Sequence, residues 1–125
     1  MDLKKILNEN YESIWNVKLG LLIRNKFNKD MSIGLIKLEG ECLKHKKEIL
    51  KFFRQYDKVF EIKSDILFVL FPFSTEIKSD MAMLRIKNKF FNIKYVVSEI
   101  SKELTVEENL KLLIIKAFKE KIGTL

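Results

Sequence analysis

The chain has 125 residues, of which 47% are hydrophobic and 33% are charged, a composition that excludes a disordered protein and predicts one globular domain with a real core. The formal net charge is +7, from 21 lysines and 3 arginines, and this surface suits an anionic ligand or an acidic partner. The longest apolar run is far too short to span a bilayer, so we expect a cytoplasmic protein with no membrane partner.

Cysteine and histidine each occur once, as Cys42 and His45. One cysteine excludes an internal disulfide, and the two residues together are too few for a zinc site. We expect both to be surface residues of a lysine-rich helix, and we expect neither a metal nor a cofactor.

The first 27 residues are predicted to be mainly helical. Apolar residues recur at helical spacing over residues 3–17, and Asp2 is placed to cap that helix. A shorter helical or turn segment follows over residues 18–27. We therefore divide the chain into an N-terminal helix, residues 1–17, and one domain, residues 18–125.

Strands and helices alternate after this segment. A first strand is predicted over residues 32–39 and is ended by Gly40, and a helix is predicted over residues 42–54. Four apolar residues are expected on the buried side of this helix: Leu43, Ile49, Leu50 and Phe53.

A β-hairpin is the clearest local signal in the chain. Two apolar runs, residues 59–62 and 66–71, flank a polar break at residues 63–65, where serine and aspartate suit a turn. The second run is apolar on both faces, which is typical of a central strand covered from both sides. Pro72 should end this strand, because proline has no N–H group for the ladder.

Three further elements complete the predicted domain. Ser74 is expected to cap a helix that runs to about Asn88, and a strand is expected over residues 91–100. Thr105 and Glu108 form a capping box for the last helix, which runs to about residue 122. The apolar positions of the two helices are Ile77, Met81 and Leu84 in the first, and Val106, Leu110, Leu113, Ala117 and Phe118, facing inward, in the second.

The predicted order is β-α-β-β-α-β, with one helix before it and one after it. This order is that of the ferredoxin-like α+β fold. We expect an antiparallel sheet with helices packed on one face. Because this fold carries many unrelated functions, function has to be argued from individual residues.

Several short motifs follow one another in a consistent order and spacing. They are Asn16–Arg24, with its Gly-Leu pair, the hairpin Lys63–Leu67, then Phe71-Pro72, Leu84–Lys87 and Val97–Ile100. In this order the chain, from about residue 16 to residue 123, resembles a strongly degenerate GGDEF domain, the fold of diguanylate cyclases.

The resemblance implies that this chain is not an enzyme. Diguanylate cyclases hold two divalent metals with carboxylates, whereas Lys37 and Ile66 stand at two of those ligand positions here. The two leading glycines of the family signature are replaced by Lys63 and Ser64, which add side chains where the substrate approaches. We therefore expect no catalytic residue and no metal site.

One family motif is retained. In the family, an Arg-x-x-Asp placed five residues before the signature holds cyclic di-GMP, and Arg54 and Asp57 stand at that spacing. Arg85 corresponds to a further arginine of that site. Arginine offers a planar fork for a guanine edge or a phosphate, and aspartate accepts from guanine N–H groups. The resemblance thus implies an inactive signalling module that binds cyclic di-GMP through Arg54, Asp57 and Arg85.

The same three residues also have a purely structural interpretation. Arg54 can bind carbonyl groups at a helix end, Asp57 can be a turn residue, and Arg85 can be a solvated helix residue. The alternative function is then a protein–protein interaction or dimerisation module without a nucleotide ligand, whose partner is a second copy or another signalling protein. Nucleic acid is not expected as the partner, because the aromatic signature of RNA-recognition motifs is missing.

Overall fold

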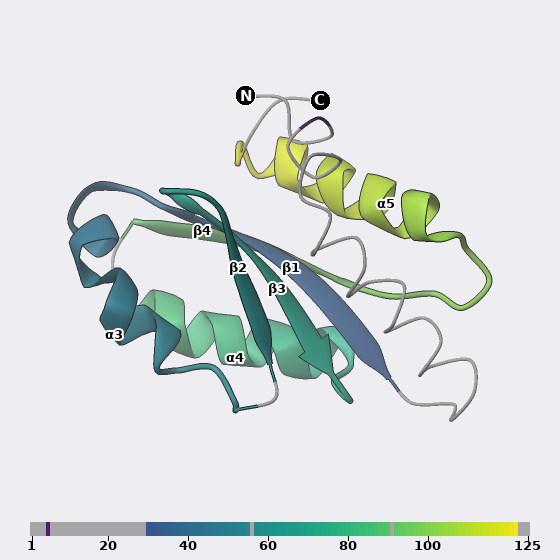
Figure 1. Ribbon diagram of the computed structural model, residues 1–125, viewed down its shortest axis with the longest axis horizontal. Coiled ribbons are helices and arrows are strands. Elements are labelled where there is room, and N and C mark those ends of the chain that lie inside the picture. Colours follow the sequence, from purple (N-terminus) through teal and green to yellow (C-terminus); the bar gives the residue numbers. More distant parts are fainter. Residues whose placement is uncertain (1–4, 6–29, 56, 91, 123–125) are drawn as a thin grey trace.

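The computed structural model describes Lys5 and residues 30–55, 57–90 and 92–122. Apart from Lys5, the predicted N-terminal helix over residues 1–17 and the segment over residues 18–27 lie outside these ranges. The described elements alternate as the sequence predicts, with two consecutive strands in the middle of the order and a final helix (Figure 1).

Four antiparallel strands form one sheet in the order β2-β3-β1-β4. They are β1 (Met31–Leu38), β2 (Lys58–Lys63), β3 (Ile66–Pro72) and β4 (Ile93–Glu99). The predicted hairpin is confirmed as β2 and β3, and β3 is a central strand that is buried on both faces. β2 and β4 are therefore the two edges of the sheet.

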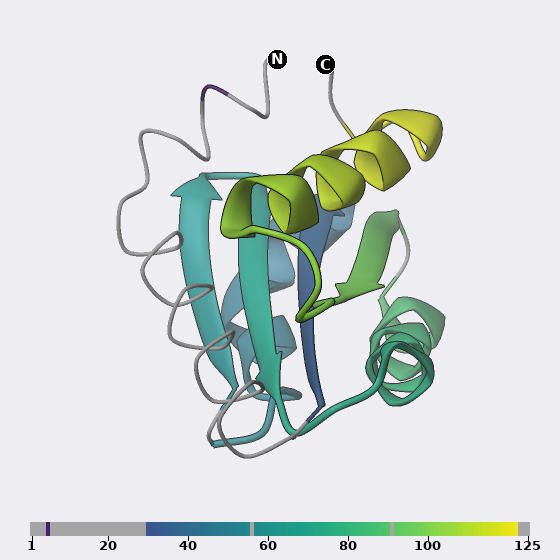
Figure 2. The same ribbon diagram turned by 90° about the vertical axis from the view of Figure 1, so that its right-hand side faces the viewer.

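Helices cover both faces of this sheet, as Figures 1 and 2 show. α4 (Glu76–Lys89) and the connection after β1 pack on one face, whereas α5 (Val106–Lys119) packs on the other. The expectation that the helices share one face therefore holds for α4 and the connection after β1, but not for α5. The reason is that β1 and β3 carry apolar side chains at alternate positions on both sides, so each face of the sheet needs a cover.

The connection between β1 and β2 is shorter and less regular than predicted. A 3-10 helix, η1 (Gly40–His45), leads into a short helix, α3 (Lys46–Leu50), where one helix over residues 42–54 was expected. Ile49 is buried as predicted, but Leu43 and Leu50 are exposed. Each of these leucines directly follows a buried residue, Cys42 or Ile49, and therefore lies on a different side of the helix from the core.

Cys42 is buried, which corrects the expectation of a surface residue. Its Sγ lies 2.9 Å from the carbonyl oxygen of Glu39 and 3.2 Å from that of Asn92, so the thiol links the end of β1 to the start of β4. Burial raises the pKa of the thiol, which favours its protonated, hydrogen-donating form. His45 is exposed, as expected.

α4 differs from its prediction in both its cap and its buried face. Thr75, not Ser74, is the N-cap, because the Thr75 hydroxyl accepts from the backbone N–H of Lys78. The predicted apolar positions Ile77, Met81 and Leu84 are all exposed. The buried face of α4 instead contains Ser79, Met83 and Ile86.

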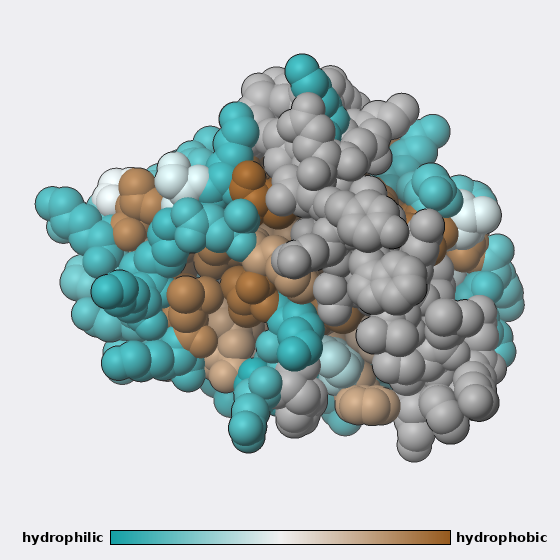
Figure 3. Space-filling model, viewed as in Figure 1, coloured by the Kyte–Doolittle hydropathy of each residue, from teal (hydrophilic) through white to brown (hydrophobic). Residues whose placement is uncertain are grey.

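α5 follows its prediction closely. Thr105 and Glu108 form the expected capping box, and the inward positions are buried apart from Phe118, which is exposed because it follows Ala117 on the outer side of the last turn. Among the described residues, no helix combines the length and the apolar character that crossing a bilayer requires. In the face seen in Figure 3, brown side chains show between teal ones over the region of β2, whose residues are half-buried or exposed.

Candidate ligand-binding site

The loop between α3 and β2 is closed by Arg54 and Asp57. The backbone N–H of Arg54 donates to Asp57 Oδ2 (2.8 Å), and the backbone N–H of Asp57 donates to the carbonyl of Arg54 (3.0 Å). The guanidinium binds the same carboxylate, with Nη2 2.8 Å from Oδ1 and Nε 3.1 Å from Oδ1. Two nitrogen atoms of the arginine, Nε and Nη2, thus donate to one carboxylate, which is the strong, planar form of this ion pair.

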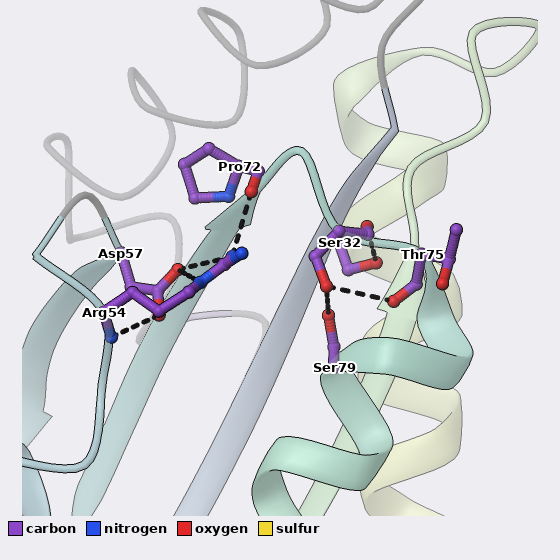
Figure 4. A network of polar contacts seen from close by, with 7 residues as sticks. Ser32, Arg54, Asp57, Pro72, Thr75 and Ser79 are labelled. Atoms are coloured by element: carbon purple, nitrogen blue, oxygen red, sulfur yellow. Dashed lines mark hydrogen bonds and ion pairs between the residues drawn. The ribbon is translucent and has the colours of Figure 1, made fainter.

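The guanidinium also ties this loop to the sheet. Nη2 of Arg54 donates to the carbonyl of Pro72, at 2.9 Å, and Pro72 is the last residue of β3 (Figure 4). The Asp57 side chain is only 3% exposed, whereas that of Arg54 is 39% exposed. Of the structural roles considered for these two residues, that of Asp57 in the turn is present, whereas Arg54 binds a carbonyl at the end of β3 and not at the end of a helix.

A cavity of about 420 Å³ opens next to this ion pair, between the end of α3 and the flank of α4. Its lining includes all three residues that the sequence selected, Arg54, Asp57 and Arg85. The other lining residues are Phe52, Phe53, Phe71, Ser74, Lys78, Ser79, Met81, Ala82 and Ile86. The cavity therefore combines aromatic walls with three cations and one buried carboxylate.

α4 contributes one side of this cavity through its helical spacing. Lys78, Ala82 and Arg85 are four and three residues apart, so their side chains lie on one flank of the helix. Both cations are exposed, and the ion pairs within the described ranges include neither of them. Their charge is thus directed to the cavity and to solvent rather than to a carboxylate of the described part of the chain.

A buried serine network supports the β3–α4 connection beside the cavity. Ser32 on β1 donates to the carbonyl of Ser74 (2.8 Å), and the hydroxyls of Ser74 and Ser79 are 2.8 Å apart. Figure 4 shows this network next to the Arg54–Asp57 pair. The expected capping residue Ser74 therefore serves to fix the loop against β1, and Thr75 caps the helix.

The turn of the β2–β3 hairpin lies at the opposite end of these strands from Arg54 and Asp57. At that end Ile66 and Leu67 are buried. Glu39 after β1 lies 3.5 Å from the Nζ of Lys94. Among the described residues, no three histidine, cysteine, aspartate or glutamate side chains gather where they could hold a metal ion.

Lys78 and Phe52 are cavity residues that sequence reasoning missed. Lys78 stands seven residues, or two helical turns, before Arg85, so its place on the same flank could have been found from spacing alone. The place of Phe52 could not have been found in this way. The helix predicted over residues 42–54 ends at Leu50, and the residues after it turn toward α4. Phe52 contacts Phe90 edge to face, with ring centroids 5.6 Å apart, which holds it at the cavity rim.

Comparison with known proteins adds no family to this description: the chain matches no protein-family model, and a search of curated proteins finds no match.

Proposed function

We propose that this protein is a non-catalytic signalling domain, GGDEF-like, that binds cyclic di-GMP in the cavity between α3 and α4. The observation that carries the proposal is that one cavity is lined by Arg54, Asp57 and Arg85, the three residues that the family resemblance assigns to cyclic di-GMP. These residues come from two segments of the chain that are more than 25 positions apart, so their meeting in one cavity is not a consequence of local sequence.

The chemistry of the lining suits a cyclic dinucleotide. Arg85 and Lys78 supply cations for phosphates, and Arg54, held in place by Asp57 and Pro72, presents a fixed guanidinium. Phe52 and Phe53 supply aromatic surfaces on which a purine can stack. A volume of about 420 Å³ lies within the usual range for small-molecule sites.

We also propose that the fold has a ferredoxin-like core. A ferredoxin-like core is supported by the order of elements and by the strand order β2-β3-β1-β4. The additional helix α5 on the second face is where the chain departs from a simple version of that core.

The test is calorimetric titration of the full chain with cyclic di-GMP, with GTP and magnesium as the control. We expect a heat of binding with cyclic di-GMP and none with GTP and magnesium. Arg85→Ala should weaken binding by about tenfold or more, because one charge-assisted hydrogen bond contributes roughly 1.5–3 kcal/mol.

A matched control is Lys111→Ala, which removes a cation from the exposed side of α5 and should leave the affinity unchanged. Arg54→Ala should also weaken binding, but it removes the clasp of the loop, so its thermal stability has to be measured beside its affinity. No heat with either ligand, or equal affinities for Arg85→Ala and Lys111→Ala, would reject the assignment.

A further inference from the structure

The outer side of α4 carries an apolar ridge that the rest of the fold leaves open. Ile77, Met81 and Leu84 are spaced by four and three residues and are 74%, 57% and 45% exposed. Phe52 adjoins this ridge, because it lines the same cavity as Met81 and is itself 45% exposed. We call these four exposed apolar side chains the α4 ridge.

Cations lie along both flanks of the α4 ridge. Lys78 and Arg85 lie on the flank toward the cavity, and Lys87 lies on the flank toward β4, 5.9 Å from the Tyr95 ring. At the end of the helix, the Nζ of Lys89 lies 5.1 Å from the ring centre of Phe52. The acidic residues of α4 are Glu76, which pairs with Lys116 at 2.6 Å, and Asp80.

We propose that the α4 ridge is a peripheral binding surface for an anionic lipid bilayer. A convex apolar ridge with cations on both sides can enter the headgroup region, where its side chains leave water and its lysines face lipid phosphates. The sequence predicted no membrane partner because no segment can span a bilayer, but a peripheral contact does not require one.

A second copy of the chain fits this surface less well. Two copies of α4 that pack ridge to ridge in antiparallel orientation bring the same flank of each helix together. The Lys78 and Arg85 flank would then face an identical row of cations. An anionic lipid surface can pair with the cations of both flanks at once. Its headgroups are fluid, so they need no groove that matches the ridge.

The test is co-sedimentation of the full chain with vesicles of phosphatidylcholine mixed with phosphatidylglycerol, and with vesicles of phosphatidylcholine alone. We expect binding to the mixed vesicles only, and weaker binding as salt is added. Leu84→Asp should lower the vesicle affinity about tenfold, because it removes one large apolar side chain from the lipid contact.

The matched control is Leu112→Asp. Leu112 is 43% exposed on α5, on the opposite face of the sheet. Its substitution should therefore leave vesicle binding unchanged. Two double variants test the charges. Lys87→Gln combined with Lys89→Gln should weaken vesicle binding, whereas Lys102→Gln combined with Lys111→Gln should weaken it much less. These four lysines do not line the cavity, so a failure here leaves the cyclic di-GMP proposal untouched.

Three outcomes would overturn the proposal. The first is no sedimentation with the mixed vesicles. The second is equal binding by Leu84→Asp and Leu112→Asp, which would indicate unspecific attraction of a basic protein. The third is a dimer in light scattering that Leu84→Asp dissociates while neither vesicle binds, which would assign the α4 ridge to a second copy.

Discussion

α4 and α5 are helices of equal length on opposite faces of one sheet, yet they relate to their sequences differently. In α5 the predicted inward stripe is buried except for Phe118, and Leu112 is a further exposed apolar residue. In α4 apolar residues occur around much of the helix, so the sequence allows two stripes. The fold buries the one with Ser79, Met83 and Ile86 and leaves Ile77, Met81 and Leu84 in solvent. Periodicity therefore identifies a buried face only where one stripe exists.

The largest expected effect comes from the same substitution made in both helices. Leu113→Ala in α5 should lower the free energy of unfolding by about 2–5 kcal/mol, because Leu113 is fully buried and its loss leaves a cavity. Leu84→Ala in α4 should change it by about 0.5 kcal/mol or less. Urea denaturation of both variants measures the difference, and a large loss for Leu84→Ala would mean that the α4 ridge is covered in the protein.

The link between the two helices can be tested by pH. Lys116 on α5 donates to Glu76 on α4 (2.6 Å) and to the carbonyl of Val97 on β4 (3.0 Å). The hydrogen bond from Lys116 lowers the pKa of Glu76 below its ordinary value of 4.5. The stability from this pair is therefore present above that pH and is lost as the pH falls through the lowered pKa of the folded state.

In Glu76→Gln this acid-dependent part of the unfolding free energy should be missing, whereas Glu103→Gln, an exposed control, should keep it. Because both partners are almost half exposed, we expect a small effect that is best seen as a change in the slope of stability against pH. Identical slopes for the wild type and Glu76→Gln would show that the pair does not join the helices in solution.

A smaller effect is expected at Tyr95, which lies on β4 beside α4. Burial, followed by the hydrogen bond to Asp80, raises the pKa of Tyr95 to about 12. The neutral phenol is favoured in the folded state, so its contribution to stability is present below the ordinary value of 10.0 and is lost as the pH rises toward about 12.

Absorbance titration of tyrosinate in the wild type and in Tyr95→Phe isolates this group by difference. We expect the missing component to titrate near 12, and a component near 10 would place Tyr95 in open solvent instead. Asp80→Asn should lower the measured value only in part, because desolvation is the larger cause.

Much of the candidate site could be predicted from the sequence, but not its shape. The resemblance to the GGDEF family pointed to Arg54, Asp57 and Arg85, and these residues share one cavity. The sequence does not show that Arg54 and Asp57 bind each other. Nor does it show that the Pro72 carbonyl accepts from Arg54, because this contact depends on where β3 ends. The position of Lys78 can be predicted from its helical spacing to Arg85. The position of Phe52 cannot, because it depends on the early end of α3.

The sequence by itself determined the order of the elements, the hairpin, the central strand β3 and the capping box of α5. These features depend on local alternation, turn residues and helix caps, which act over a few positions. Only the tertiary structure decided that α5 covers the second face, that Cys42 is buried and that the α4 ridge is open. Those outcomes depend on which apolar surfaces compete for one sheet, because a helix buries the face that the sheet can accommodate and exposes the other.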